Sequence, residues 1–158
     1  MEQSATSKEY IELKFSPQWN YVSAARGFLQ NFLAISIGDQ TKADRIAMSA
    51  SELLENAIKY SINSETYMYV EVDHKTNSAS ITVTNDSTRE SIDSLKCVYE
   101  KVTRGEPLEA YVTQMKEAAT RSDGKSQLGL VRIRYEAGAD LSLHIENDTR
   151  VSITVEMK

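Results

Sequence analysis

The residues best placed to do chemistry lie on one predicted helix. Glu52, Asn56 and Lys59 are spaced i, i+4 and i+7, and this spacing sets a carboxylate, a carboxamide and an ammonium in one line along a helix face. A carboxylate can orient a water or take a proton, and an amide oxygen one turn away is a suitable ligand for magnesium. The line is compatible with phosphate chemistry, although Glu and Lys on a helix are also typical of a solvated face.

The helix that must position these residues is predicted over residues 41–61. Its apolar residues recur at helical spacing on another side and predict burial against a core. They are Ile46, Ala50, Leu53, Leu54, Ala57 and Ile58. We expect a break at Gly38, an N-cap at Thr41 and an end near residues 61–64.

The segment ELLENAIKYS, from Glu52 to Ser61, resembles the N box of the GHKL ATPases. That family holds the histidine-kinase ATP-binding domains and the anti-sigma-factor serine kinases. The resemblance implies that Glu52 is the catalytic or water-orienting acid and that Asn56 holds Mg²⁺ beside ATP. With the order of elements around it, the resemblance covers most of the chain, but only this box is specific.

A second box of the family is matched in part. Where the family has Asp-x-Gly-x-Gly after a strand, this chain has Asn85 in place of the acid and no glycine. Asparagine can accept a hydrogen bond from an adenine amino group. We expect the side chains of Ser87 and Arg89 to crowd the approach of the backbone to a nucleotide, with Arg89 bringing a cation to the adenine position. Weak nucleotide binding follows from this departure.

The last box, Gly-x-Gly-Leu in the family, is matched fully only at Gly129 and Leu130. Backbone amides at a helix start, with one or two cations nearby, are typical of a phosphate cradle. The alternative is that Gly129 lets a helix pack closely on the sheet. The expected nucleotide-binding set is Asn56, Lys59, Asn85, Arg121, Lys125, Gly129 and Leu130.

The periodicity along the chain predicts a two-layer α/β sandwich, which is also the fold that the GHKL (Bergerat-like) resemblance implies. The predicted strands are residues 10–15, 67–73, 79–84, 141–146 and 151–156, and the predicted helices are residues 19–33, 41–61, 91–101, 107–119 and 130–138. Alternating strands and helices with one apolar stripe fit a mixed, mostly antiparallel sheet that helices cover on one face. We expect residues 1–8 to be a flexible tail and residues 9–158 to be one domain.

Composition narrows the class of protein. The 158 residues suffice for one domain and are too few for a kinase with a separate dimerisation and phosphoacceptor domain. No apolar run approaches the roughly 18 residues of a membrane helix, and the N-terminal segment is polar. We therefore expect a cytoplasmic protein without a membrane partner, and the net charge of −5 argues against nucleic acid. Cys97, in an amphipathic helical stretch, is predicted to be buried.

Two functions from different classes remain open. The first is a bacterial ATP- and Mg²⁺-dependent protein serine/threonine kinase of the anti-sigma or partner-switching type. For it the resemblance implies a regulatory protein partner, anti-anti-sigma-like or sigma-like, and leaves a homodimer open. The second is a catalytically inactive, nucleotide-free relative that keeps the fold as a protein-interaction module. Retention of Glu52 and Asn56 favours the first, and loss of the acid and of three glycines favours the second. Protein contacts are expected on residues 19–32 or on the helix pair after Asn85.

Overall fold

The structure is a computed structural model that describes residues 7–158 except residues 17, 63–64 and 121–127. Every strand and helix that the periodicity predicts is present, and most are longer than predicted. In chain order they are β1 (Lys8–Phe15), α1 (Trp19–Ile37), α2 (Gln40–Tyr60), β2 (Thr66–Asp73), β3 (Ser78–Asp86), α3 (Arg89–Thr103), α4 (Pro107–Thr120), α5 (Gly129–Tyr135), β4 (Asp140–Glu146) and β5 (Arg150–Met157).

The strands form one sheet in the order β1-β2-β3-β5-β4. All four pairings in this order are antiparallel, so the described sheet is antiparallel throughout, where a mixed but mostly antiparallel sheet was predicted. The β4–β5 hairpin turns through Asn147 and Asp148, whose φ angles of 53° and 55° match the mirror-image turn that suits a twisted hairpin. The two hairpins bring β3 and β5 side by side near the middle of the sheet.

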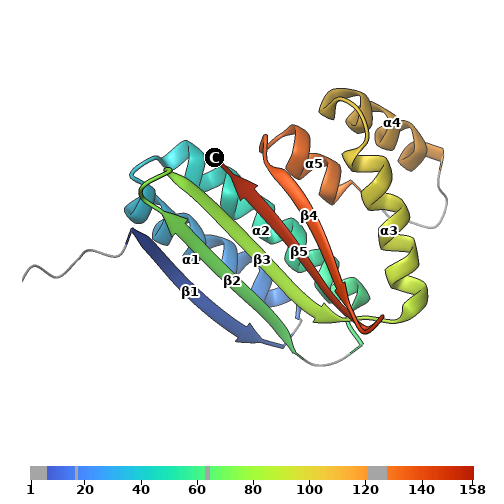
Figure 1. Cartoon of the computed structure of the whole chain (residues 1–158), viewed down its shortest axis with the longest axis horizontal. Coiled ribbons are helices and arrows are strands. Elements are labelled where there is room, and N and C mark those ends of the chain that lie inside the picture. The colour runs from blue at the N-terminus through green and yellow to red at the C-terminus, as the bar shows by residue number, and fades with distance from the viewer. Residues whose placement is uncertain (1–6, 17, 63–64, 121–127) are drawn as a thin grey trace, which may run out of the picture.

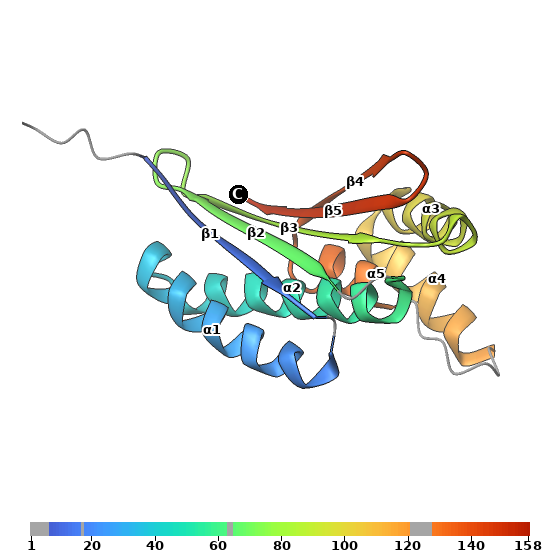
Figure 2. The same ribbon diagram turned by 90° about the horizontal axis from the view of Figure 1, so that it is seen from below.

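The predicted two-layer α/β sandwich is confirmed. Figure 1 and Figure 2 show α1, α2 and α5 on one face of the sheet, with α3 and α4 beyond its β4–β5 side. The apolar side of α2 lies in the core, where Ile46, Leu53 and Leu54 are at most 1% exposed. Inward residues of β3 such as Ile81 meet this side of the helix, because side chains alternate along a strand.

Both ends of α2 are fixed by hydrogen bonds. At the start, the Asp39 carboxylate accepts a 3.1 Å bond from the Lys42 amide, so Asp39 is the N-cap and the prediction of Thr41 is wrong. The reason is that Gly38, with φ of 75°, closes α1 and leaves a single linking residue before α2 begins. At the other end, the Ile62 amide donates to the Asp86 carbonyl at 3.0 Å, which ties the chain after α2 to the end of β3.

Cys97 is exposed on α3, so the prediction that it is buried is wrong. The buried residues of α3 are Ile92, Val98 and Val102, and Cys97 precedes Val98 by one position, about 100° around the helix. Within the ranges that the structure describes, the helices lack the combination of length and apolar character needed to cross a membrane.

Candidate functional site

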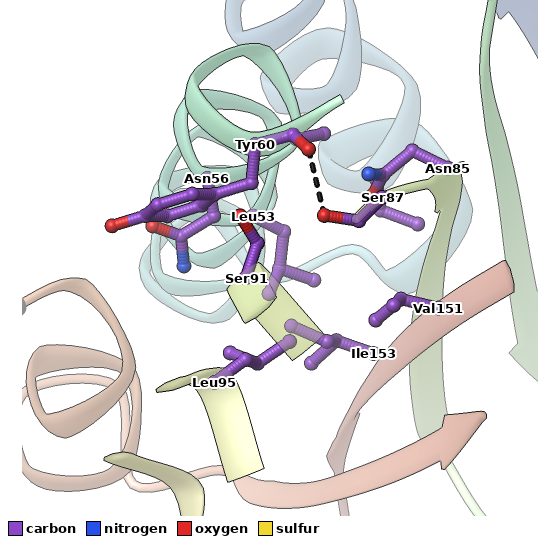
Figure 3. A pocket seen from close by; sticks show the side chains of 11 residues that line it. Leu53, Asn56, Tyr60, Asn85, Ser87, Ser91, Leu95, Val151 and Ile153 are labelled. Atoms are coloured by element: carbon purple, nitrogen blue, oxygen red, sulfur yellow. Dashed lines mark hydrogen bonds between the residues drawn. The ribbon is translucent and has the colours of Figure 1, made fainter. Parts of the chain in front are cut away.

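Two small hollows meet along the C-terminal half of α2. The first lies between α2, α3 and the ends of β3 and β5, and the second lies between α2, α3 and the start of α5. Asn56, Tyr60, Ser91 and Leu95 line both of them. Figure 3 shows the first hollow, with Asn56 and Tyr60 of α2 facing Ser91 and Leu95 of α3. We therefore treat the two hollows as one site.

Four of the predicted nucleotide-binding residues converge on this site. Asn56 lines both hollows, Asn85 lines the first, and Gly129 and Leu130 line the second. Lys59, which was predicted with them, is exposed and lines neither of the two hollows. The predicted residues Arg121 and Lys125 lie outside the described residues.

Glu52 lies one helical turn before Asn56 and is packed against α5. Its side chain is 12% exposed, and its Oε1 is 2.7 Å from Nη1 of Arg132. A Cβ added at Gly129 would lie 2.8 Å from Oε2 of Glu52, so the end of the Glu52 side chain would have to shift. Gly129 therefore lets the start of α5 come close to Glu52 on α2. The alternative was that Gly129 lets a helix pack closely on the sheet, but its nearest contact is with this helix.

Arg132 joins Glu52 to a second carboxylate. Its Nε is 3.2 Å from Oε2 of Glu136, which follows the last turn of α5. The Arg132 side chain is 40% exposed, so a half-exposed guanidinium lies over a nearly buried carboxylate. This charge-assisted contact links α2 to α5 beside Gly129, which lines the second hollow.

Burial raises the pKa of Glu52 above its ordinary value of 4.5, because desolvation of the carboxylate outweighs the attraction of Arg132. Repulsion by Glu55 and Glu136 raises this pKa further, and Lys59 offsets part of the rise. Burial opposes the charge of Arg132 as well, but Glu52 and Glu136 outweigh it and raise the pKa of the guanidinium. The two shifts act in opposite senses on the ion pair, because the raised pKa of Arg132 favours its charged form while the raised pKa of Glu52 favours its neutral form. Burial explains the difference, since it is the largest influence on Glu52, whereas two carboxylates offset it at Arg132.

Asn85 lies within β3, which continues past Thr84 to Asp86. It is paired with Val151 of β5, and its Nδ2 donates a 3.2 Å hydrogen bond to the Asp86 carbonyl. The strand was expected to end at Thr84. The longer pairing with β5 holds Asn85 on the same side as Val83, where its half-buried side chain borders the first hollow.

Of the two residues predicted to crowd the site, Ser87 lines the first hollow and Arg89 lines neither. The Ser87 hydroxyl donates a 2.7 Å hydrogen bond to the Tyr60 carbonyl at the end of α2, and the side chain is directed there in Figure 3. Arg89 begins α3, is exposed and lines neither hollow. Thr88 makes this possible, because its hydroxyl caps α3 by accepting from the Ser91 amide and turns the chain outward at that point.

Several residues at or beside the site could not be found from the spacing of residues in the N box. Arg132 belongs to α5 and Glu136 follows it, both far from Glu52 in the sequence, and Ser91 and Leu95 belong to α3. A signal for Arg132 does exist in the segment GLVRIRY of α5, where charged residues alternate with buried ones after the glycine. Such a pattern predicts a polar face but does not name the partner of either arginine.

Asn56 offers one oxygen to the magnesium-bound phosphate group that the GHKL resemblance would place beside it. Mg²⁺ in proteins takes one or two protein oxygens together with phosphate oxygens and waters, so the amide oxygen of Asn56 is a suitable ligand. Within the described ranges, His, Cys, Asp and Glu side chains do not gather in groups of three that could hold a metal by themselves. The site has no room for the adenine base of a nucleotide in this structure. The two hollows offer about 20 and 30 Å³ of free volume, which is room for one or two waters.

No protein-family model matches the chain, and no curated protein matches it. Among solved structures, it is similar to a chain in the crystal structure of the SiaB-SiaC complex from Pseudomonas aeruginosa. The two share 13% sequence identity with a TM-score of 0.67, covering 96% of this chain and 90% of that chain. At this identity the likeness concerns the fold alone.

Proposed function

We propose that this chain is a regulatory protein of the partner-switching type, built on a GHKL-like fold and acting through a protein partner. The premise is that this chain shares its fold, along nearly its whole length, with one chain of the SiaB-SiaC complex. The observation that carries the proposal is the meeting of Asn56, Gly129 and Leu130 in one hollow, with Glu52 beside Gly129. These are the residues that the resemblance assigns to a magnesium nucleotide.

In this proposal the chain transfers a phosphoryl group from ATP to a serine or threonine hydroxyl of the partner. Asn56 would hold Mg²⁺ through its amide oxygen, and when bound this ion would neutralise charge on the transferring phosphate. Glu52, once separated from Arg132, would accept the proton of the attacking hydroxyl. Its raised pKa suits a general base, because a stronger base takes a proton more readily.

The exposed side of α1 supports contact with a protein. The structure describes α1 in full, and Arg26 is the one charged residue among its 19. Large apolar side chains on a helix are usually covered, yet Phe28 is 47% exposed and Ile35 is 86% exposed, and their separation by seven positions places them on one side of α1. The ring of Phe28 stacks on Phe32 at 6.1 Å. We propose that the regulatory partner contacts this side of α1.

A second candidate, the nucleotide-free interaction module, is favoured by a different observation. The hollows have no room for an adenine ring in the present arrangement of α2 and α3, and Glu52 is engaged by Arg132 at 2.7 Å. In that case the ion pair would serve to hold α5 against α2. The regulatory role and the α1 surface would be the same for both candidates.

The two candidates are separated by calorimetric titration of the purified chain with MgATP. The first predicts saturable binding that weakens about tenfold or more in Asn56→Ala, because the variant loses the ligand for the metal. Ser94→Ala is the matched control, since Ser94 lines the same hollow from α3 and offers no comparable metal ligand. Absence of MgATP binding at millimolar concentration would reject the kinase and leave the interaction module.

The protein contact is tested separately. Proteins that co-purify with the tagged chain are compared with those retained by Ile35→Ser, and by Leu108→Ser as a control on α4, where Leu108 is 52% exposed. We expect one partner to be lost from the α1 variant only. Incubation of that partner with labelled ATP then shows whether its serine or threonine residues are phosphorylated. Retention of every partner by Ile35→Ser would contradict the α1 surface.

A further inference from the structure

Helix α4 exposes large apolar side chains and buries small or polar ones. Its buried residues are Ala110 and Gln114, whereas Leu108, Val112 and Met115 are 52%, 42% and 45% exposed. A surface helix ordinarily has the reverse arrangement, with its apolar side toward the core and its polar side in water. The exposed side of α4 therefore has the character of a surface that another molecule covers.

The exposed apolar residues of α4 form one continuous stripe. They are Leu108, Val112, Met115 and Ala119. Their separations of four, three and four positions repeat the spacing along the seam of a coiled coil. The buried residues of α4 lie on the opposite side, because each residue advances about 100° around the helix. The stripe thus faces away from the core of its own chain.

The contacts of α4 with its own chain leave this side open. Figure 1 and Figure 2 show α4 at the margin of the molecule, with α3 and α5 beside it. The ring of Tyr111 lies 4.7 Å from that of Tyr135, which ends α5. On another side, Oε2 of Glu117 is 3.8 Å from Nζ of Lys101 on α3. None of these contacts uses a residue of the stripe.

The charges beside the stripe favour a second copy of this chain as its occupant. Glu109 and Lys116 are exposed and flank the stripe on the same side, but about 10.5 Å of helix axis separates them, too far for them to pair with each other. An antiparallel second α4 that sets Leu108 against Ala119 and Val112 against Met115 would bring each Glu109 within about 3 Å, along the axis, of Lys116 on the other copy. A parallel second copy would bring each charge level with its own like charge, which is unfavourable.

We propose that α4 is a self-association surface, on which a second copy of this chain docks its own α4 in the antiparallel direction. The interface is two-fold symmetric, since each copy supplies the same stripe and the same two charges. A stripe of four residues is short, so the association is reversible and depends on concentration. Because α4 contacts α3 and α5, which line the second hollow, pairing would also restrain the walls of the candidate site. The inference uses a different helix from the α1 surface and does not rest on the proposed function.

The surface is tested by sedimentation velocity of the purified chain from about 1 μM to about 500 μM. We expect the parent to shift from monomer to dimer, and Val112→Lys to weaken this association about tenfold or more, because it places two charges in the apolar seam. Glu109→Lys and Lys116→Glu should each weaken it several-fold. The double variant should restore it, because both ion pairs form again with exchanged signs. Lys75→Glu, at an exposed position of the β2–β3 turn, is the matched charge control and should associate like the parent.

Circular dichroism confirms that each variant is folded, and Val112→Ser replaces Val112→Lys if the latter is not. A parent that stays monomeric throughout the range overturns the proposal, and so does a dimer that the Val112 variant leaves intact. A double variant that stays as weak as the single ones overturns the antiparallel pairing. Leu108→Ser should lose self-association and keep the regulatory partner. Loss of that partner with unchanged self-association would assign the stripe to the partner and reject the second copy. The α1 surface and MgATP binding are measured separately, so they stand or fall independently of these results.

Discussion

The hydroxyl of Ser87 donates a 2.7 Å hydrogen bond to the main-chain carbonyl of Tyr60, so the residue after β3 closes the C-terminal end of α2 (Figure 3). Ser87 is 3% exposed, and its amide donates to the Thr149 carbonyl at 2.8 Å. It thus joins the end of α2 to the turn before β5. At the place where the GHKL resemblance expects a glycine, this side chain stabilises a helix end.

Ser87→Ala should lower the free energy of unfolding by about 1–2 kcal/mol, because the Tyr60 carbonyl loses the donor that the buried Ser87 supplies. Urea unfolding followed by circular dichroism measures the change. Ser23→Ala, at an exposed position of α1, is the control and should stay within about 0.5 kcal/mol of the parent. Equal stability of the two variants would show that the hydrogen bond contributes nothing.

Gly129→Ala and Gly27→Ala should have opposite effects. A Cβ at Gly129 meets Oε2 of Glu52 at 2.8 Å, whereas a Cβ at Gly27 meets nothing within 4 Å. We expect Gly129→Ala to destabilise by about 1–3 kcal/mol through overpacking. Gly27→Ala should stabilise by about 0.5–1 kcal/mol, because alanine is the better residue inside a helix. Both are read from urea unfolding.

The cause of the Gly129 effect can be isolated with Glu52→Ala as a second background. Removing the carboxylate removes the atom that the new Cβ would meet. Gly129→Ala should then cost much less than it does in the parent, and the difference is the coupling of the two residues. A cost that is the same in both backgrounds would place the strain elsewhere in α5.

Glu52→Gln should gain stability relative to the parent as pH rises. The pKa of Glu52 is raised by burial in the folded state, so the contribution of the neutral carboxyl is fully present below the unfolded value of 4.5. It is lost as pH rises through the folded pKa. Unfolding free energies of the two proteins, measured from about pH 4 to about pH 8, should diverge in favour of the variant. Divergence in favour of the parent would show that the Arg132 pair outweighs desolvation.

Glu9→Gln should show the opposite dependence. The pKa of Glu9 is lowered by a 2.7 Å hydrogen bond from Ser36 and by His74, whose Nε2 is 3.0 Å from the carboxylate. Its contribution is present above the ordinary value of 4.5 and is lost as pH falls through the lowered pKa. Thermal unfolding should therefore separate parent and variant near neutral pH and not in strong acid. In a Ser36→Ala background the separation should shrink.

The strands and helices could be predicted because each is encoded by local periodicity. The apolar positions of α2 recur at helical spacing, and the β4–β5 hairpin alternates on both sides of its Asn147–Asp148 turn. The first residue of α2 was harder to predict, because Asp39 and Thr41 are both good capping residues. The backbone after Gly38 selects Asp39 as the cap.

The candidate site could be predicted from residue spacing only where its residues share one helix, and Asn85, Gly129 and Leu130 were reached through the resemblance to the GHKL boxes. The i, i+4 spacing of Glu52 and Asn56 is a local property, so the sequence carries it. The contact of Glu52 with Arg132 depends on how α5 packs against α2, and no spacing encodes that. The hydrogen bond of Ser87 could not be predicted for a related reason, since it depends on a carbonyl in another element. The small free volume of the two hollows likewise depends on the packing of α3, whose Ser91 and Leu95 line both of them.

The helices around the site are packed against the rest of the molecule to different extents, so we expect their local stabilities to differ. α2 contacts α1, the sheet and α5, whereas α4 contacts chiefly α3 and α5. In amide hydrogen exchange we therefore expect the central amides of α2, around Leu53 and Leu54, to exchange only through global unfolding. The amides of α4 should exchange through local opening at a much lower free energy. A ligand larger than water would thus gain entry by displacing α3 and α4, at a free energy well below that of unfolding, while the wall that carries Glu52 and Asn56 stays in place.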